Sequence, residues 1–341
     1  MKACVIGASG YTGRELVKLL LRHPVADLSA ITSRALVGKS VEQIIPQVAG
    51  LASDLSFSNP TSQEICDSDI DIFFLALPHG TAAHYALKLI EAGKKVIDLS
   101  ADFRLNSVEV YKEFYGEEHP AEDLLKTAQY GLPELNDLSW DKSKLIASPG
   151  CYPTSILIPL APLLESGILE NEDIVINSMS GISGAGRNAS EKLLYCERNE
   201  NASAYGLPKH RHLSEIEEQL TIFAKKPVLL SFHPHLAPMN RGICTTISAK
   251  ISNPSNFAKI YECWNEFYNG RAFTKVLPTD TFPEVSHVVG TNRVDFSAHL
   301  DTRTSRVVVC STEDNLIKGA GGQAIQSFNV CEGLDETAGL L

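Results

Sequence analysis

The chain has 341 residues, of which 44% are hydrophobic and 21% charged, a composition typical of a globular protein with about two domains. Its net charge of -11 argues against general electrostatic binding of nucleic acid. No apolar stretch reaches transmembrane length, and the first residues form a strand pattern instead of a leader peptide. The eight cysteines form no C-x-x-C pair, so we expect neither a disulfide framework nor a zinc knuckle, and a reduced, cytoplasmic setting.

The first 150 residues alternate short apolar runs with amphipathic helical patterns. We expect strands at 2–6, 27–32, 70–77, 95–99 and 144–148, and helices at 14–21 and 81–92. The run at 70–77 is continuously apolar, as expected of a strand covered on both faces. This βαβ alternation predicts an α/β domain with a Rossmann-like, doubly wound parallel sheet.

The pattern changes after residue 151. A long apolar helix at 154–164 precedes strands with few intervening helices, at 173–178, 228–232, 242–251, 274–277, 291–300 and 306–312. A further helix is expected at 256–268, and the tail 314–331 combines a glycine-rich loop with a final helix. This order predicts a second, α+β domain with a mixed sheet.

A single cysteine stands where an apolar strand gives way to this long helix, in the run S-P-G-C-Y-P at 148–153. Because proline is favoured in a first helical turn, Pro153 indicates that Cys151 lies at a helix N-terminus. The N–H groups and dipole there favour a thiolate, which is the form that attacks an acyl carbon. The alternative is a buried cysteine that acts only as a small hydrophobic side chain.

A glycine-rich turn joins the first strand to the first helix, and its residues are the candidates for binding a dinucleotide: Gly7, Ser9, Gly10, Tyr11, Thr12 and Gly13. The spacing is G-x-x-G-x-x-G, so a plain turn remains the alternative. At the end of the second strand, where NAD enzymes place a carboxylate, this chain has Ser33 and Arg34. A hydroxyl and a guanidinium suit a 2′-phosphate and favour NADP(H), unless Arg34 is simply a solvated surface residue.

A segment rich in histidine supplies the best acid–base candidate. His212 and Glu215 share one helix face, so the carboxylate can orient the imidazole and raise its basicity. A metal site remains an alternative, because His210 accompanies His212 and His233 accompanies His235. No acidic or cysteine ligand pattern accompanies either pair, so we expect no metal.

Two further loops are candidates for holding an anion. The loop 178–187 is rich in glycine and serine, and Ser180, Gly181 and Ser183 are its candidate substrate residues. A flexible turn is the other interpretation of this loop. Arg104 follows a strand of the parallel sheet, at the edge where ligands bind, and is a candidate anion clamp.

Together these segments resemble the N-acetyl-γ-glutamyl-phosphate reductases, a family in the aspartate-semialdehyde dehydrogenase superfamily. The resemblance covers essentially the whole chain. It rests on ten segments and on the order in which they follow one another: G-A-S-G-Y-T-G (7–13), T-S-R (32–34), L-P-H-G (77–80), D-L-S-A-D-F-R (98–104), S-P-G-C-Y-P (148–153), S-G-I-S-G-A-G-R (180–187), H-R-H (210–212), P-H-L-A-P-M (234–239), G-T-N-R (290–293) and D-N-L-I-K-G-A (314–320).

The resemblance implies roles for the matching residues. Cys151 would be the nucleophile that forms a thioester, and His212 the acid–base group, supported by Glu215. The glycine turn, Ser33, Arg34, Pro78 and Asn315 would hold NADP(H). The NADP-binding domain would then comprise residues 1–150 and 313–341, and 151–312 would form the catalytic and oligomerisation domain.

The implied reaction is the NADPH-dependent reductive dephosphorylation of an acyl phosphate to a semialdehyde, in arginine biosynthesis. The implied partners are the small acyl-phosphate substrate, inorganic phosphate and further copies of the chain, as a homodimer or homotetramer. The nearest alternative is a sister reductase acting on aspartyl phosphate or on a carrier-linked aminoadipyl or glutamyl phosphate. More distant alternatives are a thiol hydrolase that uses Cys151 with His212, and a non-catalytic NADP sensor.

Overall fold

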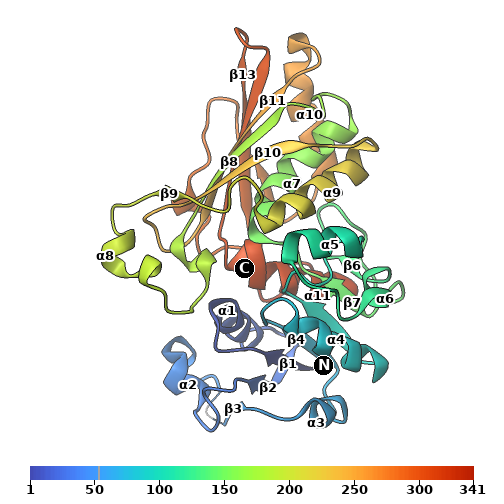
Figure 1. Ribbon diagram of the computed structural model, residues 1–341, viewed down its shortest axis with the longest axis vertical. Helices are drawn as coiled ribbons and strands as arrows, with labels where there is room; N and C mark the ends of the chain where they lie inside the picture. The colour runs from blue at the N-terminus through green and yellow to red at the C-terminus, as the bar shows by residue number, and fades with distance from the viewer. Residues whose placement is uncertain (53) are drawn as a thin grey trace. The chain divides into compact units, whose positions relative to one another are not determined.

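The computed structural model describes residues 1–52 and 54–341 (Figure 1). By its internal contacts the chain divides into two compact units, residues 1–150 with 320–341, and residues 151–319.

The first unit is built on a parallel sheet with the strand order β3-β2-β1-β4-β5-β7-β6. Its strands are β1 (Lys2–Ile6), β2 (Asp27–Thr32), β3 (Phe57–Ser58), β4 (Ile72–Leu75), β5 (Lys95–Asp98), β6 (Gln129–Tyr130) and β7 (Leu145–Ala147). Its helices are α1 (Tyr11–Leu20), α2 (Val41–Ile44), α3 (Ser62–Cys66), α4 (Thr81–Glu91), α5 (Val108–Tyr115), α6 (Glu122–Leu125) and α11 (Gly322–Cys331), with a 3-10 turn η1 (Pro46–Val48).

Both faces of this sheet are covered, as the continuous apolar run at β4 predicts. Phe74 points into a core that includes residues of α1 and α11, whereas its neighbour Phe73 points into a second core with residues of α3 and α4. The Phe74 and Phe328 rings meet edge to face at 6.1 Å. This alternation across one strand confirms the doubly wound arrangement.

The second unit contains a mixed sheet with the strand order β12-β13-β14-β11-β8-β10-β9. Its strands are β8 (Ile174–Ser180), β9 (Ser203–Ala204), β10 (Leu230–Leu236), β11 (Ile243–Lys250), β12 (Thr274–Val276), β13 (Val294–Asp301) and β14 (Arg306–Glu313). Its helices are α7 (Cys151–Glu165), α8 (Tyr195–Arg198), α9 (Arg211–Ala224) and α10 (Phe257–Phe267), with short turns η2 (Ile182–Ala185), η3 (Glu191–Leu193), η4 (Pro254–Asn256) and η5 (Val285–His287). A π-helical turn, η6 (Ile317–Gly321), follows β14.

Strands β8 and β10 are parallel because α9 makes the crossover between them, and most of the remaining pairs are antiparallel. One face of this sheet packs against α7, with α9 and α10 beside that helix (Figure 1). Burial alternates along β8 and β11, so the opposite face is more exposed. The mixed sheet predicted for this half of the chain is confirmed.

Helix α7 is almost entirely buried although it contains two prolines. Pro159 removes the N–H that would bond to the Ser155 carbonyl, and the Ser311 hydroxyl donates to that carbonyl instead, at 2.6 Å. Pro162 likewise removes the N–H that would bond to the Ile158 carbonyl, and the Tyr268 hydroxyl donates to that carbonyl instead. Side chains from other elements therefore replace the missing helical hydrogen bonds and hold α7 in place.

Candidate active site

Cys151 is the first residue of α7, and its side chain is partly exposed. The first turn of this helix is fixed by buried hydroxyl groups. The Ser155 hydroxyl hydrogen-bonds the Thr245 hydroxyl at 2.8 Å, and Thr245 in turn hydrogen-bonds Ser178 at 2.8 Å. The cysteine therefore stands at a rigidly held helix N-terminus, where the dipole favours the thiolate.

A buried carboxylate lies close to this cysteine. A Cβ atom placed on Gly319 would stand 2.7 Å from Cys151 Cβ and 2.7 Å from Glu313 Oε1, so only glycine fits between the two side chains. Glu313 is fully buried at the end of β14. No sequence pattern predicts a role for Glu313, because its proximity to Cys151 depends on the turn after β14.

His212 and Glu215 lie in the first turns of α9, in the same unit as Cys151. Glu215 is fully buried. The ring of Tyr152, the residue after the cysteine, lies 5.8 Å from the His212 ring and meets it edge to face. Helices α7 and α9 pack together, and the Tyr152 ring contacts the candidate acid–base group.

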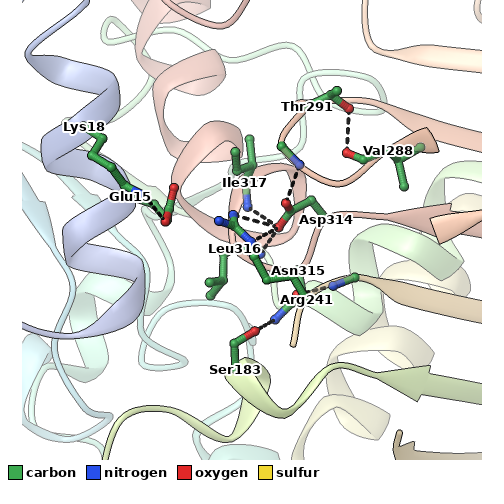
Figure 2. Close-up of polar contacts among 12 residues, drawn as sticks. Glu15, Lys18, Ser183, Arg241, Val288, Thr291, Asp314, Asn315, Leu316 and Ile317 are labelled. Atoms are coloured by element: carbon green, nitrogen blue, oxygen red, sulfur yellow. Dashed lines mark hydrogen bonds and ion pairs between the residues drawn. The ribbon is translucent and has the colours of Figure 1, made fainter. Parts of the chain in front are cut away.

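Asn315 belongs to the second unit, which extends to Gly319, beyond the residue 312 expected from the sequence. The Asn315 amide donates to the Ser183 hydroxyl at 3.0 Å and accepts the Gly242 N–H at 2.7 Å. Figure 2 shows Asn315 between Ser183 and the segment that carries Arg241. These contacts attach Asn315 to η2 and to the residue before β11, both in the second unit.

The loop after β8 forms a hydrogen-bonded turn within the protein. The backbone N–H groups of Gly181, Ile182 and Ser183 donate to the carbonyls of Gly242, Met239 and Asn240, at 2.9 to 3.1 Å. The N–H groups of these three residues are therefore bonded within the protein. Ser180 is buried, and its hydroxyl donates to the Gly181 carbonyl at 3.0 Å. A substrate role for Ser180, Gly181 and Ser183 stays a prediction that would rest on their side chains and shape.

In the first unit, the glycine turn has the geometry of a close backbone approach. Gly7 has φ +90°, and a Cβ there would lie 2.3 Å from the Ala76 carbonyl oxygen. A Cβ on Gly13 would lie 2.4 Å from the Gly7 carbonyl oxygen. Gly10 caps α1 without a side-chain hydrogen bond, and a Cβ there would have only the Gly7 oxygen nearby, at 3.8 Å. The helix N-terminus is thus left open beside Gly10, as a pyrophosphate group requires.

The end of β2 lies against this turn. The Ser33 hydroxyl donates to the Ser9 hydroxyl at 3.1 Å, and the next residue, Arg34, is exposed. Arg34 also lines a cavity of about 610 Å³. Four basic side chains and two acidic ones are among the residues that line it: Arg34, His79, His84 and Lys88, with Glu117 and Glu118. Tyr11 and Pro78, the other candidates of this group, are exposed, and Thr12 is partly buried.

Arg104 lies in a buried polar loop after β5. Its guanidinium donates to the Ser148 carbonyl at 2.8 Å and to the Leu99 carbonyl at 2.9 Å. These two N–H groups are therefore hydrogen-bonded to the backbone of the protein. The Asp102 carboxylate accepts the N–H groups of Gly80 and Ala83 at 2.7 and 2.9 Å, and so caps α4. Burial, reinforced by the nearby Asp102 charge, raises the pKa of Asp98 to about 7. An anion-clamp role for Arg104 stays a prediction.

Neither a metal centre nor a membrane span is found in residues 1–52 and 54–341. No group of three or more His, Cys, Asp or Glu side chains in this part of the chain is arranged to hold a metal ion. Among the same residues, no helix is long and apolar enough to cross a membrane.

Comparison with known proteins identifies the class. A family model described as "Semialdehyde dehydrogenase, NAD binding domain" matches residues 2–142, and one described as "Semialdehyde dehydrogenase, dimerisation domain" matches residues 151–315. The fold is also that of aspartate semialdehyde dehydrogenase II from Vibrio cholerae complexed with ASA, with a TM-score of 0.72, 16% identity and coverage of 96% and 97% of the two chains. The enzyme from Candida albicans, determined with NADP, gives a TM-score of 0.71 at 18% identity, covering 96% and 98%. The chain thus has the two domains of a semialdehyde dehydrogenase.

Closer relatives define the family within this class. The chain is 48% identical to N-acetyl-gamma-glutamyl-phosphate reductase from Akkermansia muciniphila, over 100% of this chain and 98% of that protein. It is 44% identical to the protein of the same name from Pelotomaculum thermopropionicum, over 100% and 97%. The chain belongs to the N-acetyl-γ-glutamyl-phosphate reductase family.

Tyr152, His210 and Glu313 have no catalytic or positioning role in the predictions made from the sequence. Tyr152 and His210 did belong to recognised segments, and His210 was considered only as a metal ligand. Their packing depends on contacts between α7, α9 and β10, which no local sequence pattern predicts. A buried, charged residue at the end of an apolar strand, as at Glu313, was the one available signal.

Proposed function

We propose that this chain reduces N-acetyl-γ-glutamyl phosphate to N-acetyl-L-glutamate 5-semialdehyde with NADPH, releasing inorganic phosphate, as a step of arginine biosynthesis. The name shared by its relatives at 44–48% identity supports this reaction. The observation that carries the chemistry is Cys151 at the N-terminus of α7, with the ring of the adjacent Tyr152 packed against His212 in the same unit.

Cys151 is the nucleophile of this proposal. His212, in its neutral form, accepts the thiol proton, and the thiolate attacks the acyl carbon. The bond between that carbon and the phosphate oxygen breaks, the phosphate leaves with the electron pair, and a thioester remains on Cys151. The helix N-terminus stabilises the thiolate before the attack.

A bound NADPH supplies the hydride that reduces the thioester carbon. As the C–S bond then breaks, protonated His212 returns its proton to the Cys151 sulfur and the semialdehyde is released. The departing phosphate takes the one proton that each turnover consumes from solvent. Glu215 is proposed to keep the His212 imidazole in the orientation and tautomer that this exchange requires.

The residues of the first unit fit an NADP molecule. Gly7 and Gly13 lack the side chains that would clash within the turn, and Gly10 leaves the open side of the turn available for a pyrophosphate. Ser33 and Arg34 at the end of β2 would hold the 2′-phosphate, beside the cavity that Arg34 lines. Pro78 and Asn315 complete the proposed cofactor residues, and residues 1–150 with the C-terminal tail form the proposed NADP-binding domain.

The remaining assignments concern substrate, assembly and compartment. Arg104, Ser180, Gly181 and Ser183 are proposed to bind the acyl phosphate. We propose a homodimer or homotetramer formed through the second unit, since residues 151–315 match a dimerisation domain. A cytoplasmic location is proposed because Cys151 must remain a reduced thiol to act.

The reaction run backwards gives the direct test. Purified protein is incubated with N-acetylglutamate semialdehyde and NADP⁺, with and without phosphate, and NADPH is followed by absorbance. Phosphate-dependent NADPH formation is the expected result. Phosphate-dependent turnover of aspartate semialdehyde in place of the acetylated aldehyde would instead assign the chain to the sister enzymes.

Two variants test the residue roles in that assay. Cys151→Ser is expected to bind NADPH as the parent does and to lose nearly all turnover, because a hydroxyl is a poor nucleophile at neutral pH. His212→Asn is expected to lower the rate roughly 10²–10⁴-fold, the usual contribution of an acid–base group. Substantial activity of the serine variant would exclude the covalent mechanism.

A further inference from the structure

His210 occupies the N-cap position of α9, one residue before the helix begins. Its Nδ1 atom accepts the backbone N–H of His212 at 3.1 Å. The ring therefore caps the helix through the residue proposed to exchange protons with Cys151. An N-cap acceptor satisfies one of the unbonded N–H groups of the first turn and fixes where the helix starts.

The His210 ring is enclosed by aromatic side chains from other elements. Tyr152, Tyr205 and Phe232 lie 5.7, 5.3 and 5.6 Å from its centre, and each meets it edge to face. These three rings and His210 are called the His210 cluster below. Gly206 completes the enclosure, because a Cβ there would lie 2.8 Å from His210 Cδ2. The ring consequently has little room to change its position.

The same cluster reaches the residue next to the nucleophile. The Tyr205 hydroxyl donates to the Tyr152 hydroxyl at 3.0 Å, and the Tyr152 hydroxyl donates to the His235 carbonyl at 3.3 Å. The Tyr152 ring is thereby held against both histidines of α9. The His210 cluster thus connects the first turn of α7 with the first turn of α9.

The protonation state of His210 is set by this enclosure. Burial, followed by the nearby Arg211 charge, lowers the pKa of His210 to about 4. The ring is therefore neutral near pH 7, and since Nδ1 accepts a hydrogen bond, the proton is on Nε2. A ring in this state exchanges few protons near neutral pH, unlike a general acid–base group.

We propose that His210 is a positioning residue, which holds the backbone of His212 in place through the His210 cluster and takes no part in proton transfer. The proposal rests on the proposed function, in which His212 exchanges the proton. It gives different roles to two histidines that are only two residues apart in the chain. The centres of the two rings are only 5.0 Å apart. The two histidines therefore differ in hydrogen bonding and burial rather than in position.

Three variants test this assignment. His210→Asn keeps a short acceptor at the N-cap, His210→Phe keeps an aromatic ring without an acceptor, and His212→Asn removes the acid–base group. Turnover is measured from pH 5 to 9 with saturating substrates. Alkylation of Cys151 by iodoacetamide is followed by mass spectrometry over the same range, which gives a readout that does not require turnover.

His210→Asn is expected to retain turnover within about 5-fold of the parent and to keep the pH midpoints of both profiles, because asparagine is among the best N-cap residues. His210→Phe is expected to lower kcat on the order of 10²-fold, the effect of misplacing a catalytic group, with KM and the pH midpoints unchanged. His212→Asn is expected to lose the acidic limb of the turnover profile. Circular dichroism and unfolding curves establish that each variant is folded.

Two results would overturn the proposal. The first is a loss of the acidic limb in folded His210→Asn, as in His212→Asn, since His210 would then exchange the proton. The second is parental kcat in His210→Phe, since the cap would then be dispensable. Failure of the proposed function is distinct from both, because it would appear as an inactive parent protein while the alkylation profiles still compare the two histidines.

Discussion

Arg241 and Asp314 form a hydrogen-bonded ion pair in which the carboxylate is fully buried, with 3.1 Å between Arg241 Nη2 and Asp314 Oδ1 (Figure 2). The same carboxylate accepts the N–H groups of Gly290, Leu316 and Ile317 at 2.7, 2.8 and 3.2 Å. One side chain therefore connects Gly290 with the turn that follows Asn315, a residue of the proposed cofactor site.

Asp314→Asn is expected to destabilise the second unit by about 3–5 kcal/mol, the usual cost of removing one partner of a buried ion pair. The amide offers one acceptor in place of two and leaves the guanidinium without its counter-charge. Urea unfolding followed by circular dichroism measures the loss. Asp301→Asn is the matched control, because its partner Arg303 is exposed, and its effect should stay below about 1 kcal/mol. Equal effects of the two substitutions would contradict this account.

The glycine turn separates folding from cofactor binding. Gly13→Ala is expected to destabilise the first unit by more than about 1 kcal/mol, because its Cβ would lie 2.4 Å from the Gly7 oxygen and 2.7 Å from Ala8 Cα. Gly10→Ala meets no such contact and should leave the unfolding midpoint almost unchanged. It should nevertheless weaken NADPH binding, since its Cβ would occupy the open side of the turn. Calorimetric titration with NADPH checks this, and unaltered affinity in Gly10→Ala would argue against a pyrophosphate at that position.

The regular parts of both units could be predicted from the sequence because each is determined by local periodicity. The strand β1 and helix α1 around the glycine turn are examples, and so is the start of a helix near Cys151, which Pro153 indicates. The alternation of burial along β8 likewise follows from its residues. In each case a short stretch of chain contains the whole signal.

The contacts between elements could not be predicted in the same way. The N–H groups of the loop after β8 donate to residues 239, 240 and 242, which are about sixty positions away in the chain. The attachment of Asn315 to Ser183 and Gly242 also joins distant segments, and the compact second unit extends to Gly319. His210 has its capping role only because Tyr152, Tyr205 and Phe232 enclose it. Tertiary packing determines these features, and sequence spacing carries no record of it.

The buried Asp98 makes the stability of the first unit depend on pH. Its pKa, raised from 3.8 to about 7, means that the folded chain binds this proton more tightly than the unfolded chain does. The contribution of Asp98 to stability therefore falls as the pH rises from about 4 to 7, and it levels off above that range. Asp98→Asn removes this dependence, because an amide does not ionise in this range. The amide oxygen can still accept the Ser100 N–H, which lies 3.0 Å from Asp98 Oδ1.

Urea unfolding at pH 5 and pH 8 measures the effect. The free energy of unfolding of Asp98→Asn is compared with that of the parent at each pH. This difference should favour the variant by roughly 3 kcal/mol more at pH 8 than at pH 5. The exposed Asp123→Asn serves as the control and should change the two values equally. A parental pH dependence in Asp98→Asn would show that Asp98 is ionised throughout the range.

Arg34 is the residue whose replacement should change the choice of cofactor. Its exposed side chain follows Ser33 at the end of β2 and lines the cavity of about 610 Å³, where a 2′-phosphate would receive charge-assisted hydrogen bonds. Arg34→Ala is expected to weaken NADPH binding by roughly 10–100-fold, which corresponds to the loss of about 1.5–3 kcal/mol, and to leave NADH binding unchanged. Fluorescence titration with each cofactor measures the two affinities. Arg303→Ala removes an equally charged, exposed side chain from the second unit and should alter neither. A parallel loss of affinity for both cofactors would assign Arg34 to a part of the nucleotide that NADH and NADPH share, and the preference for NADPH would then have to come from other residues that line the cavity, such as His84 and Lys88.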